Sequence, residues 1–219
     1  GNSASGLTPE QLEQIRFYNG STYYAATILS SGEVVPTSTI NYYSKATGAL
    51  NLLATWTSDV TLATNIPPAD FITPNHVFNI RNNAAPTIAA SWTVSGTNTR
   101  IIVGDGTNSC NFSVLAGQVL TASTNVSANA TLTLSNITAG QLAGIVFGNL
   151  AATSTVNYAG AGAQTVNVAT YGNLTLSVSG TKTLTGVSAI VGNFTLSGSV
   201  AATATTNMSI GHSVILGGG

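Results

Sequence analysis

Short runs in which apolar residues alternate with hydroxyl or amide residues recur from residue 77 onward, which is the pattern of half-buried β-strands. Two of these runs are nearly identical: GNLTLS occupies residues 172–177 and GNFTLS occupies residues 192–197. One more step of twenty residues reaches Val214 and Leu216. A constant step between similar runs predicts structural repeats that stack on one another.

The repeat also extends toward the N-terminus. Leu132 and Leu134 lie forty-two residues before the leucines of GNLTLS, which we interpret as two turns. Gly-Asn-Leu at residues 148–150 predicts the turn between them. A β-sandwich would explain the alternation but not the constant step, so the pattern favours a solenoid, in which each coil lays its strand over the preceding one.

We therefore predict an all-β fold, a parallel β-solenoid (β-helix) with coils of about 20–24 residues, right-handed because this hand is the commoner one. The solenoid domain spans residues 36–219, and residues 1–35 form an N-terminal extension that docks or caps. Stacked side-chain amides are expected at one corner of the coils. The predicted ladder consists of Asn149, Asn173 and Asn193.

Individual elements can also be predicted. Thr8 as N-cap, Pro9 and Gln11 indicate a short helix over residues 9–17. We expect loops over residues 44–76. Predicted strands cover residues 22–29, 38–43, 77–80, 91–94, 100–103 and 111–114, and residues 155–158 and 165–168 are predicted to form two faces of one coil.

The composition adds a functional constraint. Only 5% of the residues are charged, compared with roughly 25% in typical soluble domains, and Lys182 is the only charged residue after Asp105. Weak charge repulsion over the second half favours self-association. The net charge is −1 without a basic run, so we expect no nucleic-acid partner. The apolar-leaning residues 139–152 are shorter than the roughly 20 residues of a spanning helix, so we expect no membrane insertion.

The sequence offers no constellation of residues for catalysis, no metal site and no cofactor site, so we expect a protein that is not an enzyme. His76 and His212 have no nucleophile or carboxylate at a recognisable spacing, and we expect them at the surface or at a coil corner. Asp105 is the only carboxylate of its Gly-Asp-Gly segment, which indicates a tight turn rather than a calcium loop. Cys110 is expected to be buried inside a strand.

Four stretches follow one another in a recognisable order: YYSKATGALNLLATWTSD (residues 42–59), PADFITPNHVFNIRNN (68–83), SWTVSGTNTRIIVGDGTNSCNF (91–112) and VNYAGAGAQTVNVATYGNLTLSVSGTKTLTG (156–186). Together they resemble modules of very large, repetitive surface proteins of Bacteroidota, over roughly residues 40 to 200. The resemblance implies an adhesin-like protein that is exported by the type IX pathway and is located outside the cell, at the bacterial surface. Residues 1–35 lie outside the pattern.

Two functional hypotheses follow. In the first, the chain is a structural subunit that stacks head to tail into an extracellular filament or stalk, so that its partner is a second copy or a neighbouring repeat of a larger chain. The residues expected to mediate this self-association are Leu12, Ile15, Phe17, Tyr18, Tyr23, Tyr24, Val214, Ile215 and Leu216. In the second, the chain is an adhesin module that binds surface glycans through Trp56 and Trp92.

Overall fold

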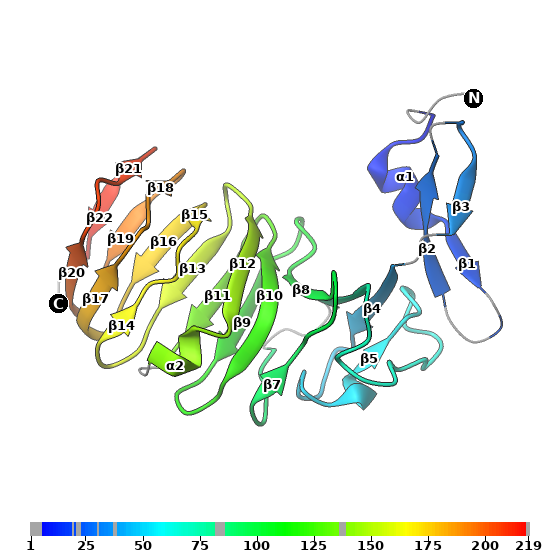
Figure 1. Cartoon of the computed structure of the whole chain (residues 1–219), viewed down its shortest axis with the longest axis horizontal. Coiled ribbons are helices and arrows are strands. Elements are labelled where there is room, and N and C mark those ends of the chain that lie inside the picture. The colour runs from blue at the N-terminus through cyan, green and yellow to red at the C-terminus, as the bar shows by residue number, and fades with distance from the viewer. Residues whose placement is uncertain are drawn as a thin grey trace.

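The computed structural model describes residues 6–18, 20, 23–29, 31–36, 39–81, 86–135 and 139–217, without the side chains of residues 9, 10, 13, 139 and 140. A small antiparallel unit lies near the N-terminus, and a stack of mostly parallel strands extends from it along the long axis of the molecule (Figure 1). This stack is a β-solenoid, so the predicted fold class is confirmed. The change from antiparallel to parallel pairing falls between Pro36 and Ile40.

The antiparallel part, called the N-terminal unit below, contains one helix and three strands in the sheet order β1-β2-β3. Its elements are α1 (Pro9–Gln14), β1 (Arg16–Tyr18), β2 (Tyr23–Ile28) and β3 (Val34–Pro36). The predicted capping box is present, because the Thr8 hydroxyl accepts from the Gln11 N–H and the Gln11 side chain accepts from the Thr8 N–H. The helix ends earlier than predicted because Ile15 already has an extended backbone, with ψ at 125°.

The first solenoid sheet is built from parallel strands that belong to successive coils. These strands are β4 (Ile40–Ser44), β6 (His76–Ile80), β8 (Arg100–Val103), β10 (Leu120–Val126) and β12 (Ile145–Leu150). The region predicted as loops, residues 44–76, also contains regular structure. The 3₁₀-helix η1 (Leu53–Thr55) leads into β5 (Trp56–Thr57), which pairs antiparallel with β4. β7 (Trp92–Thr93) pairs with the beginning of β10.

The second sheet carries the repeat that the sequence revealed. Its strands, in spatial order, are β9 (Cys110–Val114), β11 (Ala130–Leu134), β13 (Thr155–Tyr158), β16 (Asn173–Leu176), β19 (Phe194–Leu196) and β22 (Val214–Leu216). Leu174 pairs with Phe194, which in turn pairs with Val214, so the predicted twenty-residue register is confirmed.

One part of the predicted register, the turn assigned to residues 148–150, was wrong. The turn between Leu132 and Leu174 passes through Val156 of β13, not through residues 148–150. Leu150 instead pairs with Val126 in the first sheet. The same Gly-Asn-Leu triplet therefore ends β12 in the first sheet and lies at the beginning of β16 in the second, which made the two positions look equivalent in the sequence.

Two short sheets and a helix complete the later coils. The short sheets contain β14 (Gln164–Thr165), β17 (Ser179–Leu184) and β20 (Ser199–Ala204) on one side, and β15 (Thr170–Tyr171), β18 (Ala189–Ile190) and β21 (Ser209–Ile210) on another. α2 (Ala139–Leu142) precedes β12. The segments predicted to form two faces of one coil contain β13 and β14, which belong to different sheets, so this prediction is confirmed.

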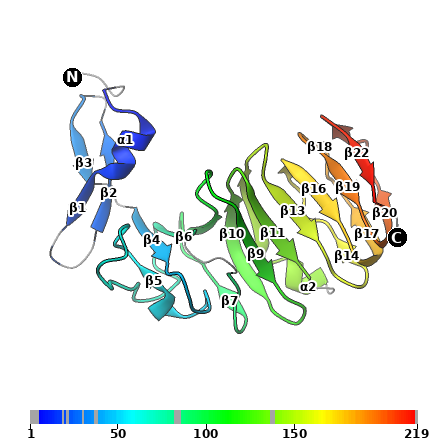
Figure 2. The same cartoon turned by 180° about the vertical axis from the view of Figure 1, so that it is seen from behind.

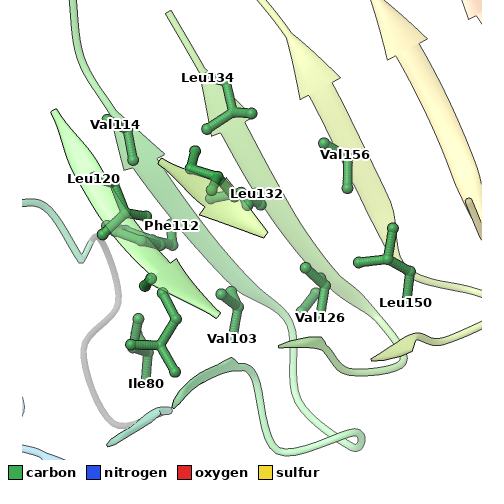
Figure 3. Packing of buried hydrophobic residues seen from close by; sticks show 14 of the residues in the cluster. Ile80, Val103, Phe112, Val114, Leu120, Val126, Leu132, Leu134, Leu150 and Val156 are labelled. Atoms are coloured by element: carbon green, nitrogen blue, oxygen red, sulfur yellow. The ribbon is translucent and has the colours of Figure 1, made fainter. Parts of the chain in front are cut away.

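A continuous apolar core fills the interior of the stack. Alternate residues of each strand point inward, as in β11, where Ala130, Leu132 and Leu134 are buried while the two threonines between them are half-buried. Figure 3 shows the leucines, valines and Phe112 of successive strands packed against one another across the coils. The alternation read from the sequence therefore corresponds to an inward and an outward face of each strand.

Candidate functional site

The last described coil presents core-facing positions to solvent. Phe194 is 6% exposed, whereas Val214, which occupies the same position one coil later, is 55% exposed. Leu216 is 73% exposed and follows the fully buried Leu176 and the half-buried Leu196 in register. Ile215 between them is 43% exposed. Each coil is covered by the next one, so these side chains form an apolar end surface on the described part of the chain.

The same end also leaves backbone groups without a partner strand. β20, β21 and β22 are each the terminal strand of a parallel sheet among the described residues. The outward N–H and C=O groups of such an edge strand are available to pair with another strand. We call the surface formed by these three strands the open edge.

The opposite end of the solenoid is closed. The antiparallel strand β5 pairs with the outer side of β4, and Trp56 on this strand is fully buried. The N–H of Leu50 donates to the carbonyl of Thr87, and the N–H of Ser113 donates to the carbonyl of Pro86, so irregular segments cover the first strands of the second sheet. Among the described residues, β5 therefore occupies the side of β4 on which a further parallel strand would pair, and β5 ends this sheet as a short antiparallel strand.

The N-terminal unit lies beyond this closed end, far from the open edge in both views (Figures 1 and 2). Of the residues predicted to mediate self-association, Tyr18 is the most exposed, at 55%. Its ring stacks on Tyr23 with the centroids 4.7 Å apart. The other predicted residues of this unit are half-buried: Leu12, Ile15, Phe17, Tyr23 and Tyr24. The unit and the open edge thus occupy opposite ends of one molecule.

The predicted asparagine ladder is divided between two sheets. The Asn173 Oδ1 atom accepts a hydrogen bond from the backbone N–H of Asn193 at 2.9 Å, and Asn193 Oδ1 accepts from the N–H of Ser213 at 3.2 Å. Asn149 does not belong to this ladder. Its N–H donates to Asn125 Oδ1 at 2.9 Å, in the first sheet. The amides thus bond to the backbone of the next coil rather than to one another.

The two tryptophans assigned to glycan contact lie inside the solenoid, where they face each other. Trp56 is fully buried and Trp92 is 2% exposed, and their ring centroids are 5.8 Å apart. Phe71 and Phe78 pack against them. A sugar ring would need an exposed aromatic face, so the assignment of glycan contact to these two rings is wrong.

The remaining candidate residues have structural partners. His76 begins β6 and is buried against Tyr42 and Phe78, so the expected surface position was wrong, and burial lowers its pKa. Cys110 is buried in β9 as predicted, and burial raises its pKa to about 11. Asp105 accepts hydrogen bonds from the N–H groups of Thr107 and Asn108, which confirms the tight turn.

The described part of the chain bears on metal binding and on membrane insertion. There, no group of three or more His, Cys, Asp or Glu side chains is close enough together to hold a metal ion. Neither described helix has the length and apolar character that crossing a membrane would require.

The structure brings together a group of polar residues that no sequence pattern had indicated. Arg16 of the N-terminal unit and Arg81, which follows β6, both contact the side chain of Tyr43. They are far apart in the chain and belong to different parts of the fold, so no sequence motif connects them.

No family model, curated protein or solved structure matches the chain.

Proposed function

We propose that the chain is a structural subunit that assembles head to tail, outside the cell, into a filament or stalk. The open edge carries this proposal: Val214 and Leu216 occupy core positions of the solenoid yet are more than half exposed. Covering such apolar surface stabilises an assembly by roughly 25 cal/mol per Å². The outer sides of β20, β21 and β22, which have no partner strand among the described residues, can add main-chain hydrogen bonds to the same contact.

The N-terminal unit of a second copy is the partner that suits this edge. The first coil is closed by β5, so coil-on-coil stacking between the two ends of successive copies is blocked. The N-terminal unit, in contrast, has β1 and β3 as the terminal strands of its own sheet and exposes the Tyr18 ring. A contact between two different surfaces of the same chain generates open fibres rather than closed dimers.

The proposed extracellular, structural role has further support in composition and in resemblance. The surface of the later coils lacks the charges that keep proteins apart, which favours ordered self-association. The four stretches that resemble bacterial surface proteins lie within the solenoid and its first loops. The Asp59 carboxylate accepts hydrogen bonds within its own turn and His76 packs against the Tyr42 ring, and such structural positions suit a scaffold better than an enzyme.

Paired charge substitutions test this contact. Leu216→Lys places a charge in the apolar open edge, and Tyr18→Lys places one on the N-terminal unit. We expect each variant to remain monomeric under conditions in which the unmodified chain forms fibres in negative-stain microscopy, because an unpaired lysine is costly to cover. The matched control is Val146→Lys, which changes a valine on the side of the solenoid, in β12, whose exposed fraction of 64% lies between those of Tyr18 and Leu216. This control should still form fibres.

Mixing the two monomeric variants distinguishes the type of contact. The Tyr18→Lys chain keeps an intact open edge and the Leu216→Lys chain keeps an intact N-terminal unit, so the mixture should form heterodimers and nothing larger in analytical ultracentrifugation. A symmetric contact between two open edges would instead let Tyr18→Lys dimerise alone. That result, or fibres formed by both variants, would show that the proposed head-to-tail contact is wrong.

A further inference from the structure

A polar cleft of about 310 Å³ lies between the N-terminal unit and the first two strands of the solenoid. Leu12 and Ala25 line it from the N-terminal unit, and Asn41 and Asn79 line it from β4 and β6. Its volume is at the lower end of the range of small-molecule sites, which is roughly 300–1,000 Å³. The cleft is therefore large enough for one compact ligand.

Two arginine side chains contact the same tyrosine, Tyr43, in this cleft. An Arg16 guanidinium nitrogen donates to the Tyr43 hydroxyl at 2.9 Å, and the guanidinium carbon of Arg81 lies 4.1 Å from the centre of the Tyr43 ring. Both arginines line the cleft. The chain has only five Lys and Arg residues, so this is a local concentration of positive charge in a nearly neutral protein. Charges in a partly enclosed cleft interact more strongly with a ligand than charges in open solvent.

The guanidinium groups also retain unused donors. Arg16 Nε is buried and has no hydrogen-bond partner among the described residues. No described residue accepts a hydrogen bond from the Arg81 guanidinium, which lies over the Tyr43 ring. A buried donor without a partner carries a free-energy cost, which an acceptor within hydrogen-bonding distance would relieve. Planar, bidentate acceptors such as carboxylates fit guanidinium donors best.

The carboxylates of the described aspartates are occupied elsewhere. Asp105 is near enough to Arg81 for the positive charge to help lower the pKa of Asp105, yet its oxygens accept hydrogen bonds from Thr107 and Asn108 in its own turn. Asp59 and Asp70 are likewise bonded within their own turns. No described carboxylate lines the cleft, so its positive charge is open to an anion from outside.

The amide groups indicate what else the ligand carries. Asn41 and Asn79 both line the cleft, and Asn79 Nδ2 donates to Asn41 Oδ1 at 3.2 Å. The Nδ2 group of Asn41 and the Oδ1 atom of Asn79 remain as a donor and an acceptor without a partner among the described residues. Neighbouring donor and acceptor groups suit hydroxyls, which can both donate and accept. A carboxylate with adjacent hydroxyl groups, at the size of one pyranose ring, satisfies both features.

We propose that this cleft binds a uronic acid unit, with its carboxylate between Arg16 and Arg81 and its hydroxyls on Asn41 and Asn79. The site does not depend on head-to-tail assembly, because it lies entirely within one chain. Anion binding here would also hold the N-terminal unit against the first coil, since Arg16 and Arg81 belong to the two different parts.

Titration of the isotope-labelled full chain, followed by two-dimensional NMR, tests the site directly. D-Glucuronate should shift the backbone signals of Asn41, Tyr43 and Asn79, whereas D-glucose, which lacks the carboxylate, and acetate, which lacks the hydroxyls, should bind at least tenfold more weakly. Raising the salt concentration should weaken glucuronate binding, because the contact is between charges.

Arginine variants complete the test. Arg81→Gln should lower glucuronate affinity by about tenfold or more, as loss of a charged hydrogen-bonding partner does, and Arg16→Gln should do the same. Arg100→Gln, which removes the third arginine of the chain from outside the cleft, should leave affinity unchanged. Unchanged affinity in Arg81→Gln with a wild-type spectrum, equal binding of acetate, or no binding of glucuronate would each overturn the proposal.

Discussion

At the scale of single residues, Lys182 shows how a solenoid accommodates a buried charge. Its side chain is fully buried in β17, and its Nζ atom donates to the carbonyls of Gly160 and Gly162 and to Gln164 Oε1 at 2.6, 2.9 and 2.7 Å. Gln164 in turn donates to the carbonyl of Leu134 at 3.0 Å, one coil further back. Burial lowers the pKa of Lys182. Three oxygen acceptors nevertheless match the three N–H groups of an ammonium ion.

This geometry predicts that Lys182 stabilises the fold although it places a charged side chain in the interior of the solenoid. Lys182→Met keeps most of the side-chain volume but removes the Nζ donor from the carbonyls of Gly160 and Gly162, while Gln164 Oε1 keeps only the Gly160 N–H, so the free energy of unfolding should fall by about 2 kcal/mol. Urea unfolding measures this change. The control is Lys45→Met at the only other lysine, whose hydrogen bonds are exposed and whose loss should cost less than about 1 kcal/mol. An unchanged or raised stability in Lys182→Met would contradict the prediction.

At the scale of elements, the Gly-Asn corner before β16 and β19 explains why the repeat is visible in the sequence. Asn173 Oδ1 accepts from the N–H of Asn193, and a Cβ atom at Gly192 would meet that same oxygen and also the carbonyl of Gly172, 2.9 Å away. The glycine lets the next coil approach, and the asparagine then bonds to it. Both residue types are therefore required at one corner of successive coils.

Gly192→Ala should accordingly destabilise the stack. The added methyl group has no room against the Asn173 side chain and the backbone of the preceding coil, and overpacking of this kind costs about 1–3 kcal/mol. Thermal unfolding followed by circular dichroism should show the loss as a lower Tm. The matched control is Gly217→Ala on the exposed last coil, where the nearest atoms are 3.3 Å from the new methyl group. Equal Tm values for both variants would argue against the corner's role.

The same corner marks the limit of what the sequence could predict. The register from Leu174 to Val214 was predictable because the coil length is constant there. Asn149 was assigned to the wrong ladder because the same triplet occurs in another sheet, before coils of a different length. β5 and β3 were missed because short antiparallel strands carry no period, and the burial of Trp56 depends on contacts between distant segments.

The Arg16 and Arg81 cleft was beyond sequence reasoning for a related reason. It exists only because the N-terminal unit packs on the side of the first coil, where Arg16 reaches Tyr43. Neither arginine lies in a repeat or a motif, and their meeting point is defined by tertiary packing alone. Periodic features of the molecule are thus encoded locally, whereas its sites are formed where the period is interrupted.

At the scale of the whole molecule, the solenoid is a nearly one-dimensional object in which each coil is stabilised by its neighbours. Middle strands such as β13 and β16 have a partner strand on both sides, while β22 has one on a single side among the described residues. The first coil has β5 as an additional cover. Stability should therefore decrease toward the open edge and not toward the closed end.

Native-state hydrogen exchange tests this gradient and its link to assembly. In monomers, amides of β20, β21 and β22 should exchange fastest within the solenoid and those of β11 and β13 slowest, with β4 better protected than β22, because local opening follows the number of covering contacts. In assembled fibres the protection of β20 to β22 should rise toward that of the middle coils, while β12, on the side of the stack, stays unchanged. Uniform exchange along the monomer would contradict the one-dimensional picture. Fibres whose open edge still exchanged rapidly would place the contact between copies on another surface of the molecule.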